Sequence, residues 1–198
     1  MSLAEPIAVT LELAEGLEAL GLNYVVGGSI ASSLHGIPRA TQDIDIVVVL
    51  WGKDVEGFVA RFESSFYVDR DMVMDAIRRR ASFNIIHLAT MYKVDVFIAD
   101  RSDLVREELD RRLAIELGEP PRRVWVCSAE DIVLQKLDWY EQGNQISDRQ
   151  WTDVIGVMKV QGHKLDLAYL HRWADTKGLR KLLEKALREA GLTSHSDQ

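Results

Sequence analysis

A glycine turn between two apolar segments constrains this chain more than any other feature. Residues 24–26 are apolar, residues 27–29 read Gly-Gly-Ser, and residues 43–50 are again dominated by Ile and Val. Glycine adopts backbone angles that other residues avoid, and it leaves room for close approach to the main chain. The pattern predicts a strand, a tight turn, a short helix over 29–36 and a second strand.

The glycine turn (Gly27-Gly28-Ser29) offers a place for phosphate. Ser29 is a suitable N-cap for the following helix, and a helix start carries unpaired N–H groups and a partial positive charge. Both features suit a phosphate group, so we predict that Gly27, Gly28 and Ser29 bind the phosphates of a nucleotide. An ordinary strand-to-helix turn is the alternative.

Two aspartates begin the second strand. Asp43 and Asp45 alternate with Ile44 and Ile46, so the carboxylates lie on one face of the strand and the isoleucines on the other. Neighbouring carboxylates repel each other unless a cation joins them, and a divalent metal ion is the natural partner. The pair therefore predicts a metal site, whereas a solvent-facing strand start is the alternative.

A third aspartate lies inside a later strand. Asp95 sits among Val and Phe in residues 92–98, which follow residues 83–88 after a short link and so predict a β-hairpin. Burying an unpaired carboxylate in such surroundings is costly. We expect Asp95 to meet the first two carboxylates if the two strands are neighbours. An ion pair with Lys93 or Arg101 is the alternative.

These residues carry a resemblance to a known superfamily. The glycine turn, followed after thirteen residues by Asp43-Ile44-Asp45, resembles the signature of the DNA polymerase β-like nucleotidyltransferases. Arg39-Ala40-Thr41 resembles the AbiEii/AbiGii toxin-like branch of that superfamily. The resemblance implies an α/β (α+β) fold with a mixed sheet flanked by helices and a C-terminal helical bundle. It also implies an enzyme that transfers a nucleotidyl group from an NTP to an acceptor hydroxyl.

The resemblance assigns a role to each aspartate. Asp43 and Asp45 are expected to bind Mg²⁺, which neutralises the triphosphate and orients its α-phosphorus. Asp95 is expected to complete the site of a second Mg²⁺ ion and to help deprotonate the attacking hydroxyl. The predicted catalytic and metal-binding set is therefore Asp43, Asp45 and Asp95.

Three further residues are candidates for nucleotide contacts: Arg39, Thr41 and Lys136. Arg39 can clamp a phosphate through two N–H groups, or it can pair with a nearby acid on the surface. Lys136 follows Glu-Asp on a helix capped at Ser128, as in the resembling branch, and a lysine that reaches out to water is the alternative.

Arg149 and Asp153 come next along the chain. They are four residues apart on one predicted helix. The resembling branch also has an Arg and an Asp after its lysine, but this spacing predicts a surface ion pair.

A Gly-Glu-Pro-Pro segment at residues 118–121 is the clearest break in the 198-residue chain. We predict an α/β nucleotidyltransferase core over 1–121 and a helical region over 122–198 that packs on it. A helix is expected over 102–117, directly before the break.

Composition limits the partners. The net charge of −7 argues against nonspecific nucleic-acid binding. There is no apolar run of membrane length, no signal-peptide pattern at the N-terminus and only one cysteine, Cys127, so we expect a cytoplasmic protein without a membrane partner.

The sequence leaves several classes of acceptor for the nucleotidyl group. The toxin-like resemblance favours an RNA end or a protein hydroxyl as acceptor and an antitoxin as a partner, while a small molecule of the aminoglycoside type is an alternative. Arg78-Arg79-Arg80 is either a contact for such an RNA or a solvated helix end. A non-catalytic module that binds nucleotide or antitoxin is the competing function.

Overall fold

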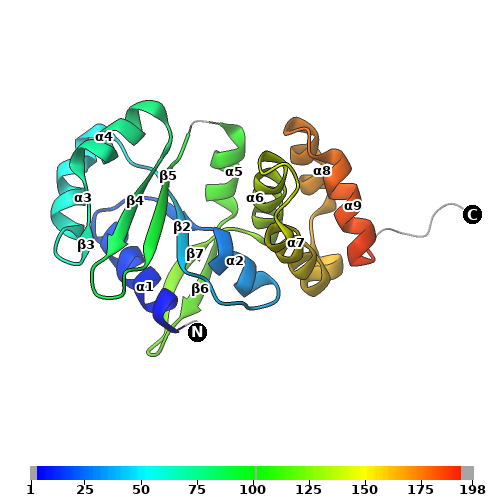
Figure 1. Cartoon of the computed structure of the whole chain (residues 1–198), viewed down its shortest axis with the longest axis horizontal. Coiled ribbons are helices and arrows are strands. Elements are labelled where there is room, and N and C mark those ends of the chain that lie inside the picture. Colours follow the sequence, from blue (N-terminus) through cyan, green and yellow to red (C-terminus); the bar gives the residue numbers. More distant parts are fainter. Residues whose placement is uncertain (1–3, 101, 193–198) are drawn as a thin grey trace, which may run out of the picture. The chain divides into compact units, whose positions relative to one another are not determined.

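The computed structural model describes residues 4–100 and 102–192, and its strands form one seven-stranded mixed sheet of order β3-β4-β5-β2-β1-β7-β6 (Figure 1). The strands are β1 (Tyr24–Val26), β2 (Asp43–Val48), β3 (Phe66–Tyr67), β4 (Ser82–His87), β5 (Lys93–Ile98), β6 (Leu113–Leu117) and β7 (Arg122–Val126). The α-helices are α1 (Ala4–Ala19), α2 (Gly28–His35), α3 (Val55–Phe62), α4 (Arg70–Arg79), α5 (Asp103–Arg111), α6 (Ala129–Gln142), α7 (Asp148–Gln161), α8 (Leu167–Thr176) and α9 (Arg180–Ala190). Short 3₁₀ turns are η1 (Gly52–Asp54) and η2 (Gly162–Lys164). The predicted α/β class with a mixed sheet is confirmed.

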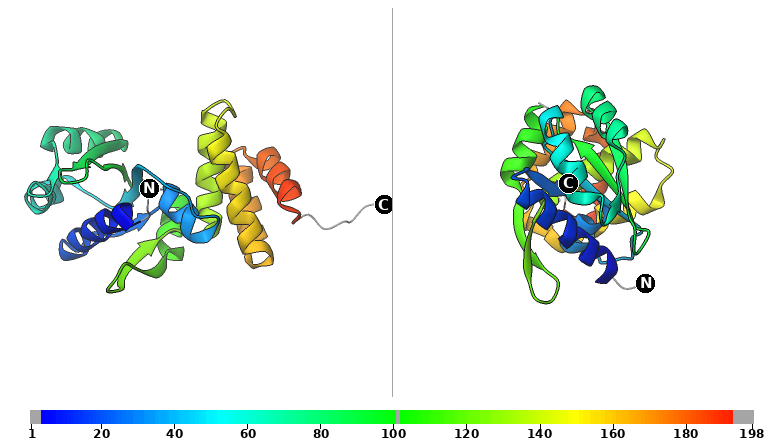
Figure 2. Two further views of the ribbon diagram at one scale, coloured as in Figure 1. Left: turned by 60° about the horizontal axis from the view of Figure 1, so that its bottom comes forward. Right: turned by 90° about the vertical axis from the view of Figure 1, so that its left-hand side faces the viewer.

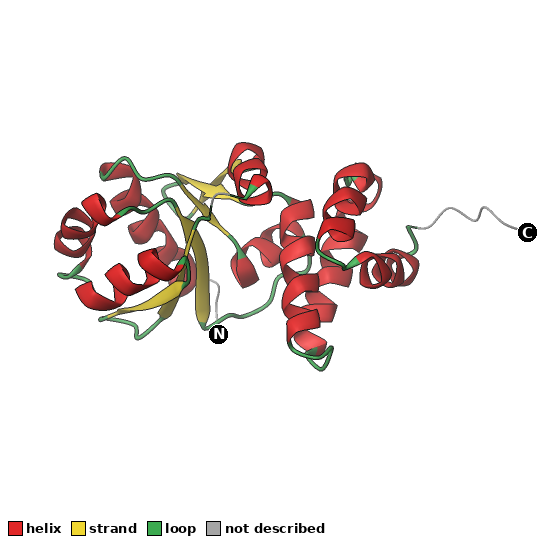
Figure 3. Cartoon of the chain, turned by 90° about the horizontal axis from the view of Figure 1, so that it is seen from above, coloured by secondary structure: helices red, strands yellow, loops and turns green. Residues whose placement is uncertain are grey.

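The described residues form two compact units. The sheet unit comprises the described residues up to Ile30 together with Ala40–Cys127, and the helical unit comprises Ala31–Arg39 and the described residues from Ser128 onward. In Figure 3 the strands are yellow, and residues 128–192 are drawn as red helices and green loops. β7 lies in the sheet because it runs parallel to β1. The domain boundary expected at residues 121 and 122 stays a prediction.

Alternation along β2 and β5 divides the sheet into an apolar face and a polar face. Ile44, Ile46 and Val48 of β2 are fully buried, as are Val94 and Val96 of β5. The aromatic rings of α3 cover this side near β4, where Phe58 packs edge-on against Phe83, and α1 and α4 also pack against strands of the sheet. β2 is a central strand between β5 and β1, which explains its continuous apolar sequence.

The helix expected over 102–117 is correct only in its first half. α5 ends at Arg111, and residues 113–117 form β6, which pairs antiparallel with β7 in a hairpin (Figure 2). Gly118 takes a φ of +80° in the connecting turn, an angle that glycine tolerates. Hydrogen bonding to β7 therefore overrides the helical pattern of residues 113–117, because strand formation depends on a partner that a local pattern does not reveal.

The helical unit is organised around α6 and α7, which pack against each other, with α8 and α9 packed on them. Ser128 caps α6 as predicted: its Oγ accepts a hydrogen bond from the main-chain N–H of Asp131 at 3.1 Å and donates to Oδ2 of Asp131 at 2.6 Å. Tyr169 of α8 donates to the other carboxylate oxygen of Asp131 at 2.5 Å. No helix formed by residues 4–100 and 102–192 is both long and apolar enough to cross a membrane.

Candidate active site

The glycine turn is locked onto β2 by main-chain contact. Gly27 donates its N–H to the carbonyl of Asp45 at 3.0 Å. Gly28 has a φ of +55°, and a Cβ at this position would lie 1.8 Å from Oδ2 of Asp45. Only glycine therefore fits at position 28, because both the backbone angle and the space exclude a side chain. The Asp45 carboxylate consequently lies against the turn that leads into α2.

α2 begins at Gly28, one residue earlier than expected. Ser29 therefore lies inside the first turn of the helix, and its assignment as the N-cap is wrong. The physical reason is that Gly27 makes the last hydrogen bond to β2, so the chain turns into the helix directly after it. The first N–H groups of a helix point out of its N-terminus, which is the feature that suits an anion at the start of α2.

The three aspartates share the polar face of the sheet. β2 and β5 are adjacent and parallel, and their register sets Asp45 directly beside Asp95 and Asp43 directly beside Lys93. Asp45 and Asp95 are half-buried, whereas Asp43 at the start of β2 is exposed. Side chains at directly paired positions of neighbouring strands lie on the same face. The face therefore carries two rows of side chains across β2 and β5. One row has the carboxylates of Asp45 and Asp95, and the other has the carboxylate of Asp43 and the ammonium group of Lys93.

Lys93 lies among these carboxylates. Its Nζ is 2.8 Å from Oδ2 of Asp95 and 3.6 Å from Oδ1 of Asp43. The hydrogen bond to Asp95 raises the pKa of Lys93 above its usual value, and the negative charge of both aspartates adds to this effect. The ion pair that we gave as the alternative for Asp95 is thus present with Lys93. Arg101, the other partner considered, lies outside the described residues.

The donor chemistry of this face fits a divalent metal, because carboxylate oxygens are the ligands that Mg²⁺ prefers. The observed side-chain arrangement fits it less well. Among residues 4–100 and 102–192, no three Asp, Glu, His or Cys side chains are placed to hold a metal ion together. Lys93 lies between two of these carboxylates, bonded to Asp95 and near Asp43.

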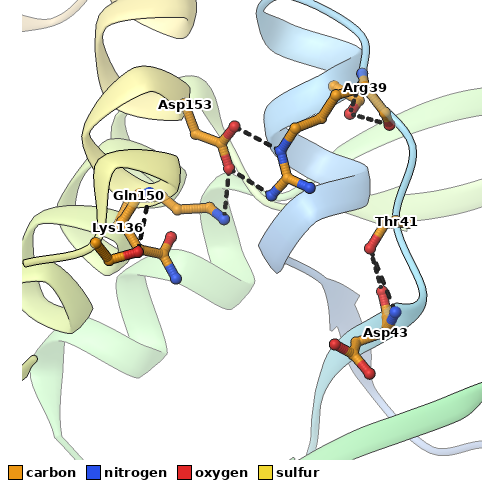
Figure 4. A network of polar contacts seen from close by, with 8 residues as sticks. Arg39, Thr41, Asp43, Lys136, Gln150 and Asp153 are labelled. Atoms are coloured by element: carbon orange, nitrogen blue, oxygen red, sulfur yellow. Dashed lines mark hydrogen bonds and ion pairs between the residues drawn. The ribbon is translucent and has the colours of Figure 1, made fainter.

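Thr41 supports the start of β2. Its hydroxyl donates to the carbonyl of Asp43 at 2.8 Å and accepts from the N–H of Asp43 at 3.3 Å (Figure 4). The residue is 7% exposed. This local hydrogen bonding holds the backbone from which the Asp43 side chain projects. The predicted nucleotide contact of Thr41 stays a prediction beside this positioning role.

Arg39 and Lys136 both bond to one buried carboxylate within the helical unit. Arg39 donates from Nε and Nη2 to the two oxygens of Asp153, each at 2.8 Å, and Lys136 Nζ lies 2.8 Å from Oδ2 of Asp153 (Figure 4). The side chains of Lys136 and Asp153 are only 2% and 5% exposed. Burial by itself would raise the pKa of Asp153, but the bonds from Arg39 and Lys136 hold that pKa below its usual value.

This cluster corrects two interpretations of the sequence. Asp153 does not form a surface pair with Arg149, because it is buried and bonded to two other cations. Lys136 does not extend to water, because it is 1% exposed. Arg39 makes the acid pair that was one of its two alternatives, although its partner is buried. The nucleotide contacts predicted for Arg39 and Lys136 stay predictions.

Solved structures similar to this chain include nucleotidyltransferases and nucleotidyltransferase-like proteins. An antigenic nucleotidyltransferase-like protein from Paracoccidioides brasiliensis is 19% identical, with a TM-score of 0.54 over 92% of each chain. The antibiotic-resistance factor ANT(2'')-Ia in solution is 14% identical, with a TM-score of 0.57 over 88% of this chain and 96% of that chain. Its crystal structure in complex with adenylyl-2''-tobramycin is 13% identical, with a TM-score of 0.57 over 91% of this chain and 98% of that chain.

This chain has the nucleotidyltransferase fold. At such low identity the likeness establishes the fold alone. No protein-family model and no curated protein sequence matches the chain. The fold agrees with the resemblance to the superfamily that the sequence showed. The assignment to the AbiEii/AbiGii toxin-like branch stays a prediction.

On the polar face of this nucleotidyltransferase fold, the hairpin of β4 and β5 adds a residue that the sequence analysis did not single out. Asn84 of β4 is exposed and directly opposite Asp95. Asn84, Asp95 and Asp45 therefore form one row across three strands. The sequence of the expected hairpin could have placed Asn84 on the polar face. Alternation in residues 83–88 puts Phe83 and Ile85 on the buried side and Asn84 on the other.

The arginines that end α4 pair with an acid of their own helix. Arg78 and Arg79 make ion pairs with Asp75, at 2.9 and 3.0 Å, and are largely exposed. This arrangement is typical of a solvated helix end. The RNA contact considered for Arg78, Arg79 and Arg80 stays a prediction.

Proposed function

We propose that this chain is a nucleotidyltransferase that transfers a nucleotidyl group from an NTP to an acceptor hydroxyl. One observation carries the proposal: Asp45 lies directly beside Asp95 on parallel neighbouring strands and, on its other side, against Gly28 of the glycine turn. Carboxylates and the start of a helix thus meet on one face of a sheet whose fold is that of nucleotidyltransferases. Such a pairing suits a reaction at a phosphate.

The chain's own residues supply binding and proton transfer. Main-chain N–H groups of Gly28 and Ser29, at the start of α2, hold the phosphates that leave as pyrophosphate. Asp95, half-buried on the polar face, accepts the proton of the acceptor hydroxyl. The acceptor oxygen then forms a bond to the α-phosphorus while the bond to the pyrophosphate oxygen breaks. A divalent ion, when bound by Asp43, Asp45 and Asp95, would neutralise the triphosphate and orient the α-phosphorus.

Two classes of acceptor follow from different observations. The residues that resemble the toxin-like branch favour an RNA end or a protein hydroxyl, with an antitoxin as a partner. The likeness in fold to ANT(2'')-Ia, which was crystallised in complex with adenylyl-2''-tobramycin, favours a small-molecule hydroxyl. We place the RNA or protein acceptor first and make the small molecule an arm of the same experiment.

A non-catalytic module that binds nucleotide is the second candidate function. The observation that favours it is the ion pair of Lys93 with Asp95, because it engages the carboxylate that the reaction would need as its proton acceptor. In that case the chain would gain thermal stability with an NTP but would transfer nothing.

The deciding experiment is label transfer from each NTP labelled at its α-phosphate, with Mg²⁺, to total RNA, to proteins of a cell extract, to aminoglycosides and to the chain itself. We expect transfer to one acceptor class, and we expect Asp45→Asn or Asp95→Asn to lower its rate by about 10²–10⁴-fold. Asp71→Asn is the matched control, because Asp71 is a carboxylate of the sheet unit whose side chain is 93% exposed. Absence of transfer to every acceptor, or transfer that survives both site variants, would rule the enzyme out.

A further inference from the structure

The polar face of the sheet contains a cation that belongs to the chain. Lys93 precedes Asp95 by two residues on β5, so both side chains lie on the same face. The register brings Lys93 opposite Asp43. Its ammonium group lies 2.8 Å from an oxygen of Asp95 and 3.6 Å from an oxygen of Asp43. A positively charged group of the protein thus touches one, and approaches another, of the three carboxylates that define the proposed site.

An ammonium group and a divalent ion compete for these carboxylates. Two positive charges a few ångströms apart repel each other strongly, even in a partly solvated site. The formal charge of Asp43, Asp45 and Asp95 is −3, and Lys93 reduces it to −2. Lys93 therefore bonds to one oxygen that a metal ion could use, Oδ2 of Asp95, and lies near a second, Oδ1 of Asp43.

The Lys93 side chain is free to move to solvent. It is 43% exposed, whereas the Asp95 side chain is 20% exposed. A long, half-exposed lysine can leave an ion pair without opening a cavity, since exposed pairs contribute little to stability. The lysine is thus a replaceable counter-ion and not a buried part of the core.

We propose that Lys93 competes with divalent metal for Asp43 and Asp95, so that the free protein takes up a metal ion only when Lys93 swings out to solvent. The inference rests on the proposed function, because it concerns metal uptake by the same site. It assigns Lys93 a positioning role: the lysine holds the carboxylates until the metal replaces it. Removal of its charge should therefore strengthen metal binding.

The test is a titration of the full chain with Mn²⁺, in which free Mn²⁺ is measured by electron paramagnetic resonance. We expect Lys93→Met to bind Mn²⁺ about tenfold more tightly than the unmodified chain or better, as expected when a nearby positive charge is removed. Lys93→Arg keeps the charge and should not tighten binding. Lys53→Met is the matched control, because Lys53 is an exposed lysine of η1, after the opposite end of β2.

Each outcome decides the inference. A dissociation constant for Lys93→Met within twofold of that of the unmodified chain overturns it, as does tighter binding by Lys93→Arg, or the absence of Mn²⁺ binding by all chains. Binding by Lys93→Met alone supports it. Lys93→Gln repeats the measurement if the Met variant does not fold. The proposed function fails separately: if Lys93→Met binds Mn²⁺ more tightly but no chain transfers label, the competition stands and the catalytic proposal falls.

Discussion

Two groups of charged side chains in this molecule look alike in composition but differ in burial. On the polar face of the sheet unit, Lys93 is bonded to Asp95 and both side chains are partly open to solvent. In the helical unit, Asp153 is bonded to Arg39 and Lys136 with almost no exposure of the carboxylate or the lysine. A buried charge must keep its partners, because water cannot replace them. A half-exposed charge can exchange its partner.

This difference indicates that the charged side chains of the sheet unit are suited to chemistry and that the cluster around Asp153 contributes to stability. The cluster around Asp153 is complete, with both carboxylate oxygens accepting from cations. In the sheet unit, Lys93 is bonded to Asp95 and lies near Asp43, and all three side chains are partly exposed. The expected effects of substitutions should therefore separate the two groups.

Asp153→Asn should have the largest effect on folding. The change removes the negative charge and leaves Arg39 and the buried Lys136 without their counter-ion. Breaking a buried pair from one side costs about 3–5 kcal/mol, so we expect a loss of that size in the free energy of unfolding, measured with urea. Asp71→Asn, at an exposed carboxylate, should change it by less than about 0.5 kcal/mol.

The same comparison has a pH dependence of known sign. The pKa of Asp153 is lowered in the folded protein, so its contribution is present above the unfolded value of about 3.9 and is lost as the pH falls through the lower folded value. The difference in unfolding free energy between the unmodified chain and Asp153→Asn should thus be constant from pH 7 to about pH 5 and shrink below about pH 4. A difference that grows on acidification would contradict the assigned ion pairs.

Gly28→Ala should have an intermediate effect. The methyl group would meet Oδ2 of Asp45 at 1.8 Å, and the φ of +55° adds backbone strain. We expect a loss of about 1–3 kcal/mol in unfolding free energy, the size of one strained residue. Gly21→Ala is the control, because Gly21 has a φ of +66° but nothing within 4 Å of an added Cβ. Equal losses at both positions would mean that the contact with Asp45 costs nothing.

Lys93→Met should have the smallest effect on folding. Its ion pairs are half-exposed, so we expect a change of less than about 1 kcal/mol in unfolding free energy without metal, and a smaller change at high salt. A loss as large as that of Asp153→Asn would remove the contrast between the two groups. It would show that Lys93 is a structural residue and not a replaceable counter-ion.

Local patterns in the sequence were sufficient for much of the fold. The alternation of Asp and Ile in β2 predicted its two faces, and the Ser128 cap predicted the start of α6. β6 was missed because its strand conformation depends on pairing with β7. The local sequence of β6 does not reveal its strand conformation, because that conformation is stabilised by hydrogen bonds to β7.

The candidate site shows the same division. The tight turn at Gly28 and the shared face of Asp43 and Asp45 follow from the sequence alone, because backbone angles and period-two alternation are local properties. The position of Asp95 beside Asp45 follows only from the folded chain, since strand order and register depend on contacts between distant segments. The bond between Arg39 and Asp153, 114 residues apart, was decided in the same way. The packing of helices and strands determines which charged side chains become neighbours, and spacing along the chain does not.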